Sequence, residues 1–103
     1  MNSEAEVRAA MLKTNEEARL MVLECYKDLD ELRSDLAERR IRLDNIKAFE
    51  GDTEFVQFCE EEADDSHKTI EKFEKQLKKM DSDNRTTRKL IEDMFLNKTG
   101  VLV

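Results

Sequence analysis

Apolar residues recur at alternating intervals of three and four along most of this chain, with a few polar exceptions. In the first half the series runs through Val22, Cys25, Leu29, Leu32, Leu36, Arg39, Leu43 and Ile46. In the second half it runs through Cys59, Ala63, Ser66, Ile70, Phe73, Leu77, Met80, Asn84, Thr87, Ile91 and Met94. This spacing places each series on one stripe of a helix, as in left-handed coiled-coil packing. The sequence therefore predicts an all-α fold.

A single break separates the two series. Gly51 lies between them, and the 103 residues contain no Pro and only one other Gly. A stop between two amphipathic helices predicts a long antiparallel helical hairpin of the coiled-coil type. The expected boundaries are a module over 1–97, with helices at 4–49 and 54–97, a turn at 50–53 and a C-terminal tail at 98–103.

Two local signals refine these boundaries and leave one alternative open. Ser3 with Glu6 forms a capping-box pattern, and Asp52 or Thr53 is suited to cap the second helix. The polar run 81–84, "DSDN", favours caps over helix interiors. The second helix is therefore either continuous or broken near 81–84, which would give a three-helix arrangement.

Pairing the stripes predicts a register in which the numbers of facing residues sum to about 102. Facing pairs are then Leu43 with Cys59, Leu36 with Ser66, Leu29 with Phe73, Val22 with Met80 and Met11 with Ile91. The register gathers polar stripe positions at one level, and a buried Asn there would fix the register. Asn84 is the expected residue. The expected packing residues are Val22, Leu29, Leu32, Leu36, Leu43, Ile46, Ile70, Phe73, Leu77, Met80 and Ile91.

Several apolar residues lie off the stripes, and a two-helix hairpin would leave them in water. Contiguous exposed apolar surface is rare on soluble monomers, so these residues indicate a partner. The candidate partner-facing residues are Leu20, Leu23, Tyr26, Phe58 and Phe95, together with the acidic Glu60, Glu61 and Glu62. We expect a homodimer, another helical protein, or both as partners. Phe49 and Phe55 are expected to pack together across the turn.

No residue pattern predicts catalysis, a cofactor or a metal site. The acidic cluster at 50–65 lacks calcium-loop spacing and is interpreted as a solvated hairpin end, partly neutralised by Arg39, Arg40 and Arg42. His67 has only the surroundings of a solvated helix face. Cys25 and Cys59 lie on the stripes, too far apart in this register to form a disulfide.

Charge and hydropathy narrow the function further. A net charge of −7 disfavours nucleic acid as a partner, and no apolar run is long enough to span a membrane. The chain also lacks a signal-peptide pattern, so we expect an intracellular, cytoplasmic location. The expected function is a non-catalytic coiled-coil oligomerisation or docking module within a larger assembly or scaffold. The alternative is a monomeric three-helix adaptor that presents a groove to a partner helix.

Overall fold

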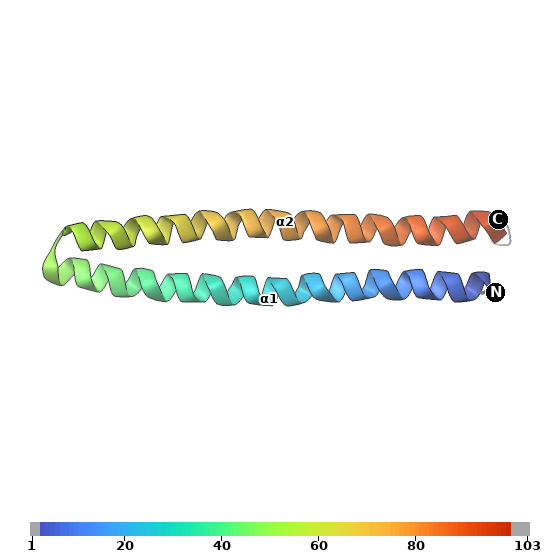
Figure 1. Cartoon of the computed structure of the whole chain (residues 1–103), viewed down its shortest axis with the longest axis horizontal. Coiled ribbons are helices and arrows are strands. Elements are labelled where there is room, and N and C mark those ends of the chain that lie inside the picture. Colours follow the sequence, from blue (N-terminus) through green and yellow to red (C-terminus); the bar gives the residue numbers. More distant parts are fainter. Residues whose placement is uncertain (1–2, 100–103) are drawn as a thin grey trace. The chain divides into compact units, whose positions relative to one another are not determined.

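The chain folds into two long helices that pack against each other (Figure 1). A computed structural model describes the backbone of residues 3–99 and the side chains of residues 3–95. Helix α1 spans Glu4–Glu50 and helix α2 spans Glu54–Thr99, which confirms the helical hairpin. Helix α2 is continuous through 81–84, so the three-helix arrangement does not form. The end of the expected tail, residues 100–103, lies outside the described residues.

Hydrogen bonds at the helix ends show how the turn is built. Gly51 has a φ of 82°, a left-handed conformation that favours glycine, and its N–H donates to the Lys47 carbonyl at 2.8 Å. Thr53 Oγ1 then accepts from the Val56 N–H at 3.2 Å. Thr53, not Asp52, is therefore the residue whose side chain caps α2. Ser3 Oγ caps α1 in the same way, at 3.2 Å from the Glu6 nitrogen.

The contacts divide the hairpin into two compact units. The turn unit is Cys25–Gln76, and the terminal unit combines Met1–Glu24 with Leu77–Val103. Within each unit, a segment of α1 lies beside a segment of α2 (Figure 1). The turn unit carries sixteen Asp and Glu against nine Lys and Arg, whereas the terminal unit carries nine of each. The net negative charge of the chain therefore belongs to the turn unit.

One row of each stripe forms the core. This inner row repeats every seven residues and comprises Asn15, Val22, Leu29, Leu36 and Leu43 on α1, and Val56, Ala63, Ile70, Leu77, Asn84 and Ile91 on α2. Every member is buried except Asn84, which is half-buried. Val56 continues the α2 series one step before Cys59, the residue at which the sequence analysis began it. Burial of this row supplies most of the apolar stabilisation that the hairpin has.

The other row of each stripe is not buried. This outer row comprises Met11, Ala18, Cys25, Leu32, Arg39 and Ile46 on α1, and Cys59, Ser66, Phe73, Met80, Thr87 and Met94 on α2. Leu32, Ile46 and Met80, which were expected to be interaction or packing residues, are 48%, 38% and 50% exposed, so the single hairpin does not bury them. Phe73 is half-buried.

Helix geometry explains why the rows differ. At 3.6 residues per turn, a residue three positions on is rotated about 60° to one side, and a residue four positions on about 40° to the other. In this hairpin the contact is centred on the inner row, and the positions on either side of it are mostly half-buried or exposed. Phe95, four residues after Ile91, is only 9% exposed, so the single chain already covers this candidate partner-facing residue.

Two further expectations are corrected by the packing. Asn15, not Asn84, supplies the buried side chain of the polar layer: its Nδ2 donates to the Asn84 carbonyl at 2.9 Å. Asn84 contributes its backbone carbonyl there, and the residue as a whole is half-buried. Phe49 is 93% exposed and does not pack with Phe55, since it lies on the flank of α1 that the hairpin leaves uncovered.

Candidate protein–protein interface

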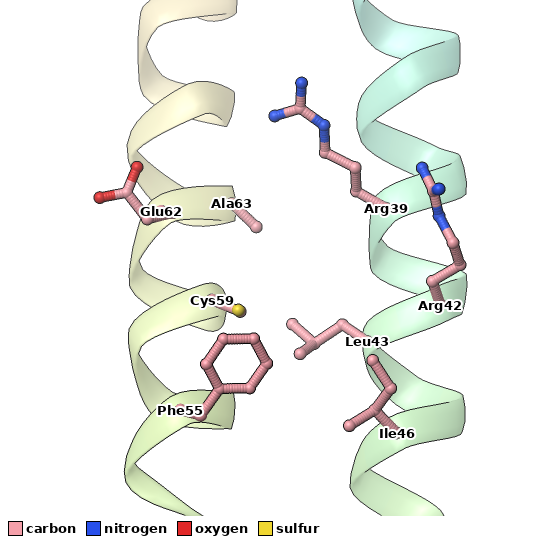
Figure 2. A pocket seen from close by; sticks show the side chains of 8 residues that line it. All are labelled: Arg39, Arg42, Leu43, Ile46, Phe55, Cys59, Glu62 and Ala63. Atoms are coloured by element: carbon pink, nitrogen blue, oxygen red, sulfur yellow. The ribbon is translucent and has the colours of Figure 1, made fainter.

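The outer rows and the residues beside them form an open face on each unit. In the turn unit, one depression of this face is lined by Arg39, Arg42, Leu43, Ile46, Phe55, Cys59, Glu62 and Ala63. Figure 2 shows Leu43, Cys59 and Ala63 pointing into the space between the helices, with the Phe55 ring beside them. The floor is therefore apolar, and charged side chains stand at its edges.

The open face of each unit has a further depression. In the turn unit, Leu32, Leu36, Ser66 and Ile70 line the next depression. In the terminal unit, Met11, Asn15, Thr87 and Ile91 belong to the walls of another. Leu43 and Cys59, Leu36 and Ser66, and Met11 and Ile91 each share a depression, so the structure brings these expected facing pairs together.

Ion pairs between the helices lie on the opposite side of the seam, which we call the closed side. It also has a depression in the turn unit, lined in part by Arg33, Arg40, Asp64 and Glu74, so the name refers to the ion pairs that join the helices there. In the turn unit, Arg33 pairs with Glu74, Arg40 with Asp64 at 3.2 Å and Lys47 with Glu60 at 3.0 Å. In the terminal unit, Arg88 lies 3.8 Å from Glu16. Arg33, Arg40 and Lys47 repeat every seven residues, four positions after Leu29, Leu36 and Leu43. Such exposed pairs contribute only about 0–1 kcal/mol each to the stability of the hairpin. They therefore help to hold the helices together on this side but supply little of the total stability.

The pKa of Lys47 reflects its place in this closed side. Its hydrogen bond to Glu60 and the charge of Glu60 raise the pKa of Lys47 above its usual value. Lys47 therefore stays protonated throughout the neutral range.

The acidic cluster is divided between the two sides of the seam. Asp64 and Glu60 are paired on the closed side, whereas Glu61 and Glu62 are exposed. Within residues 3–95, no three His, Cys, Asp or Glu side chains are grouped closely enough to hold a metal ion. His67 Nε2 lies 3.0 Å from Glu71 on the same helix, and both side chains are more than half exposed. Cys25 and Cys59 are half-buried free thiols.

Arg39 differs from the expectation that it would be neutralised by the acidic cluster. It lines the same depression as Glu62 and Ala63, and Figure 2 shows its side chain extending across the gap toward α2 while the Glu62 carboxylate points away from α1. Among the described side chains, no ion pair involves Arg39, Arg42 or Glu62. The open face of the turn unit thus carries an apolar floor and charges without opposite partners.

The remaining candidate partner-facing residues are distributed around the hairpin. Leu20, Leu23 and Phe58 are exposed, and Leu23 follows the buried Val22, so it lies off the open face. Tyr26 is half-buried on the closed side, seven residues before Arg33. A further row lies beside the outer row and was not predicted from the sequence. It is formed by Asp35, Arg42 and Phe49 on α1 and by Phe55, Glu62 and Thr69 on α2. Their sevenfold spacing was the available signal.

Comparisons with known proteins add no family or function. Neither described helix has a stretch long and apolar enough to cross a membrane. No protein-family model matches the chain, and no curated protein or solved structure is significantly similar to it.

Proposed function

We propose that this chain is a non-catalytic helical oligomerisation module that acts within a larger assembly. Two copies cover each other's open faces and so complete a four-helix bundle of the coiled-coil type. The observation that supports this proposal is the difference between the two rows of the seam. A heptad stripe has two apolar rows, and the single hairpin buries only one of them.

The surface area of the chain agrees with this proposal. The chain exposes 8413 Å². A compact globular protein of 12.1 kDa exposes only about 6000 Å². The excess of roughly 2400 Å² per chain is ample for a stable interface, since standard interfaces bury about 1200–2000 Å² in total. A second copy is the simplest occupant because a shared twofold interface needs only the surface already present.

Sedimentation equilibrium across a concentration series, with a matched pair of leucine variants, tests the proposal. Leu32 and Leu23 are both on α1 and are 48% and 47% exposed, but only Leu32 belongs to the outer row. Leu32→Ser should weaken self-association about 10-fold or more, because two half-exposed leucines per dimer lose burial. Leu23→Ser should leave self-association unchanged.

Three results would contradict the proposal. A wild-type chain that stays monomeric and folded at tens of micromolar would exclude self-association as the function. If only Leu23→Ser weakened self-association, the interface would instead be formed by the apolar residues around 20–26. Binding of a different protein's helix to the monomer, lost in Leu32→Ser, would favour the docking adaptor instead.

A further inference from the structure

We propose that a second copy of this chain binds the open face of the turn unit, with the turns of both copies at the same end of the dimer. In this arrangement Arg42 of each copy pairs with Glu62 of the other. This inference rests on the self-association proposed above and adds the orientation of the two copies. It starts from residues that the hairpin leaves without partners: Arg42, Glu62 and the exposed Phe49 and Phe55.

These residues belong to one row on each edge of the open face, which we call the rim. The rim comprises Asp35, Arg42 and Phe49 on α1 and Phe55, Glu62 and Thr69 on α2. Residues that meet between the helices have numbers that sum to 102 on the open face, as in Leu43 with Cys59, and to 104–107 in the ion pairs of the opposite side. With a sum of about 104, Arg42 is opposite Glu62, Phe49 opposite Phe55, and Asp35 opposite Thr69, each to within about one helical turn.

Twofold symmetry allows two ways to bring the open faces together. If the axis runs along the helices, every residue keeps its level, and α1 of one copy lies beside α2 of the other. If the axis runs across the helices, levels are inverted, and α1 lies beside α1 of the other copy. In either case the rims of the two copies become neighbours, so the rim residues distinguish the two arrangements.

The lengthwise axis gives each rim residue a suitable neighbour. Arg42 meets Glu62 of the other copy, an opposite-charge pair suited to charge-assisted hydrogen bonds. Phe49 meets Phe55, which would cover two aromatic rings that are 93% and 61% exposed in one chain. Asp35 meets Thr69, whose hydroxyl can donate to a carboxylate. All three neighbours occur twice, because the interface is symmetric.

The crosswise axis gives a poorer match. It can also satisfy Arg42, by placing it beside Asp35 of the other copy. The same register then places Phe49 beside Asp28 and Phe55 beside Gln76, so both aromatic rings face polar side chains. The lengthwise arrangement is therefore the one that the rim favours.

Charges of both signs lie in this layer. Arg39 and Arg42 on α1 line the two depressions of this face, together with Asp35 on α1 and Glu62 and Asp65 on α2. Counted over both copies, this gives four positive and six negative side chains, so every arginine can have a carboxylate as its neighbour. Opposite charges at the contact matter because each turn unit is acidic overall, and two acidic units side by side otherwise repel.

Charge-reversal variants, compared by sedimentation equilibrium, test the inference. Arg42→Glu and Glu62→Arg should each weaken self-association about 10-fold or more, because like charges then face each other across the interface. An equimolar mixture of the two variants should associate as heterodimers close to the wild-type affinity. Within each variant chain residues 42 and 62 carry like charges, so restored association in the mixture can come only from pairing between chains.

Glu61→Arg is the matched control, since Glu61 is exposed and lies away from the open face. It should associate as the wild type does, and circular dichroism should show all variants helical. Wild-type dimers that survive both rim reversals, or a mixture that fails to associate, would overturn the same-end arrangement while leaving self-association intact. A monomeric wild type would overturn the proposed function and this inference together.

Discussion

Leu29 and Leu32 are the same residue type, three positions apart on the same helix and in the same stripe, yet they have different environments. Leu29 is 0% exposed and Leu32 is 48% exposed. The difference extends along both helices: the inner row is buried, whereas no member of the outer row is. A heptad stripe specifies two rows for burial, but one helical neighbour can cover only the row that the contact is centred on.

The largest effect is expected when a leucine of the inner row and a leucine of the outer row are each replaced by alanine and their losses of stability are compared. Leu29→Ala should lower the free energy of unfolding by about 2–5 kcal/mol, since it leaves a cavity in the inner row. Leu32→Ala should cost less than about 1.5 kcal/mol in the dilute monomer, because about half of its side chain is already in water. Urea unfolding at low concentration measures both. Equal losses would show that the rows are equally packed in solution.

A second prediction concerns the one polar side chain of the inner row that is buried. Asn15→Leu should raise the melting temperature, because an apolar residue replaces a buried amide that fixes register at some cost in stability. The same change should broaden the distance distribution between spin labels at Glu17 and Lys89, both exposed positions of the terminal unit.

The control for this substitution is Asn45→Leu at an exposed site on α1. It should change neither the melting temperature nor the label distances appreciably. A narrow, unshifted distribution in Asn15→Leu would mean that the hydrogen bond to the Asn84 carbonyl does not determine the register.

The smallest effect is expected for the pH dependence of stability that the Glu16 carboxylate of the terminal unit contributes. The hydrogen bond from Arg19, and then the charges of Arg19 and Arg88, lower the pKa of Glu16 below its usual 4.5. Because the folded pKa is the lower one, this group stabilises the fold above pH 4.5, and that contribution is lost as pH falls through the folded pKa. The stability difference between wild type and Glu16→Gln should therefore be positive at pH 7 and vanish in acid.

Thermal unfolding between pH 7 and pH 3 measures this difference. Glu17→Gln is the control, because Glu17 makes no ion pair among the described side chains. A difference for Glu16→Gln that is the same at both pH values would contradict the assignment.

The fold was largely predictable because its signals are local. The stripes predict two helices, Gly51 predicts the turn, and Ser3 and Thr53 are recognisable caps. The open face was not predictable in the same way. Leu32 and Met80 carry the same periodic signal as Leu29 and Leu77, so periodicity alone assigned all four to the core. Phe95 lies off the stripe and is nevertheless buried, which periodicity did not predict.

The amino-acid pattern by itself determined two helices, one turn and an approximate register, since spacing, caps and a left-handed glycine act over a few residues. Only the tertiary structure decided which row is buried, that Asn15 and not Asn84 supplies the buried amide, and that Arg42 and Glu62 are left unpaired beside an apolar floor. The physical reason is rotation about the helix axis. A rotation of a few tens of degrees leaves the pattern unchanged but exchanges the side chains that face the neighbouring helix for those that face water.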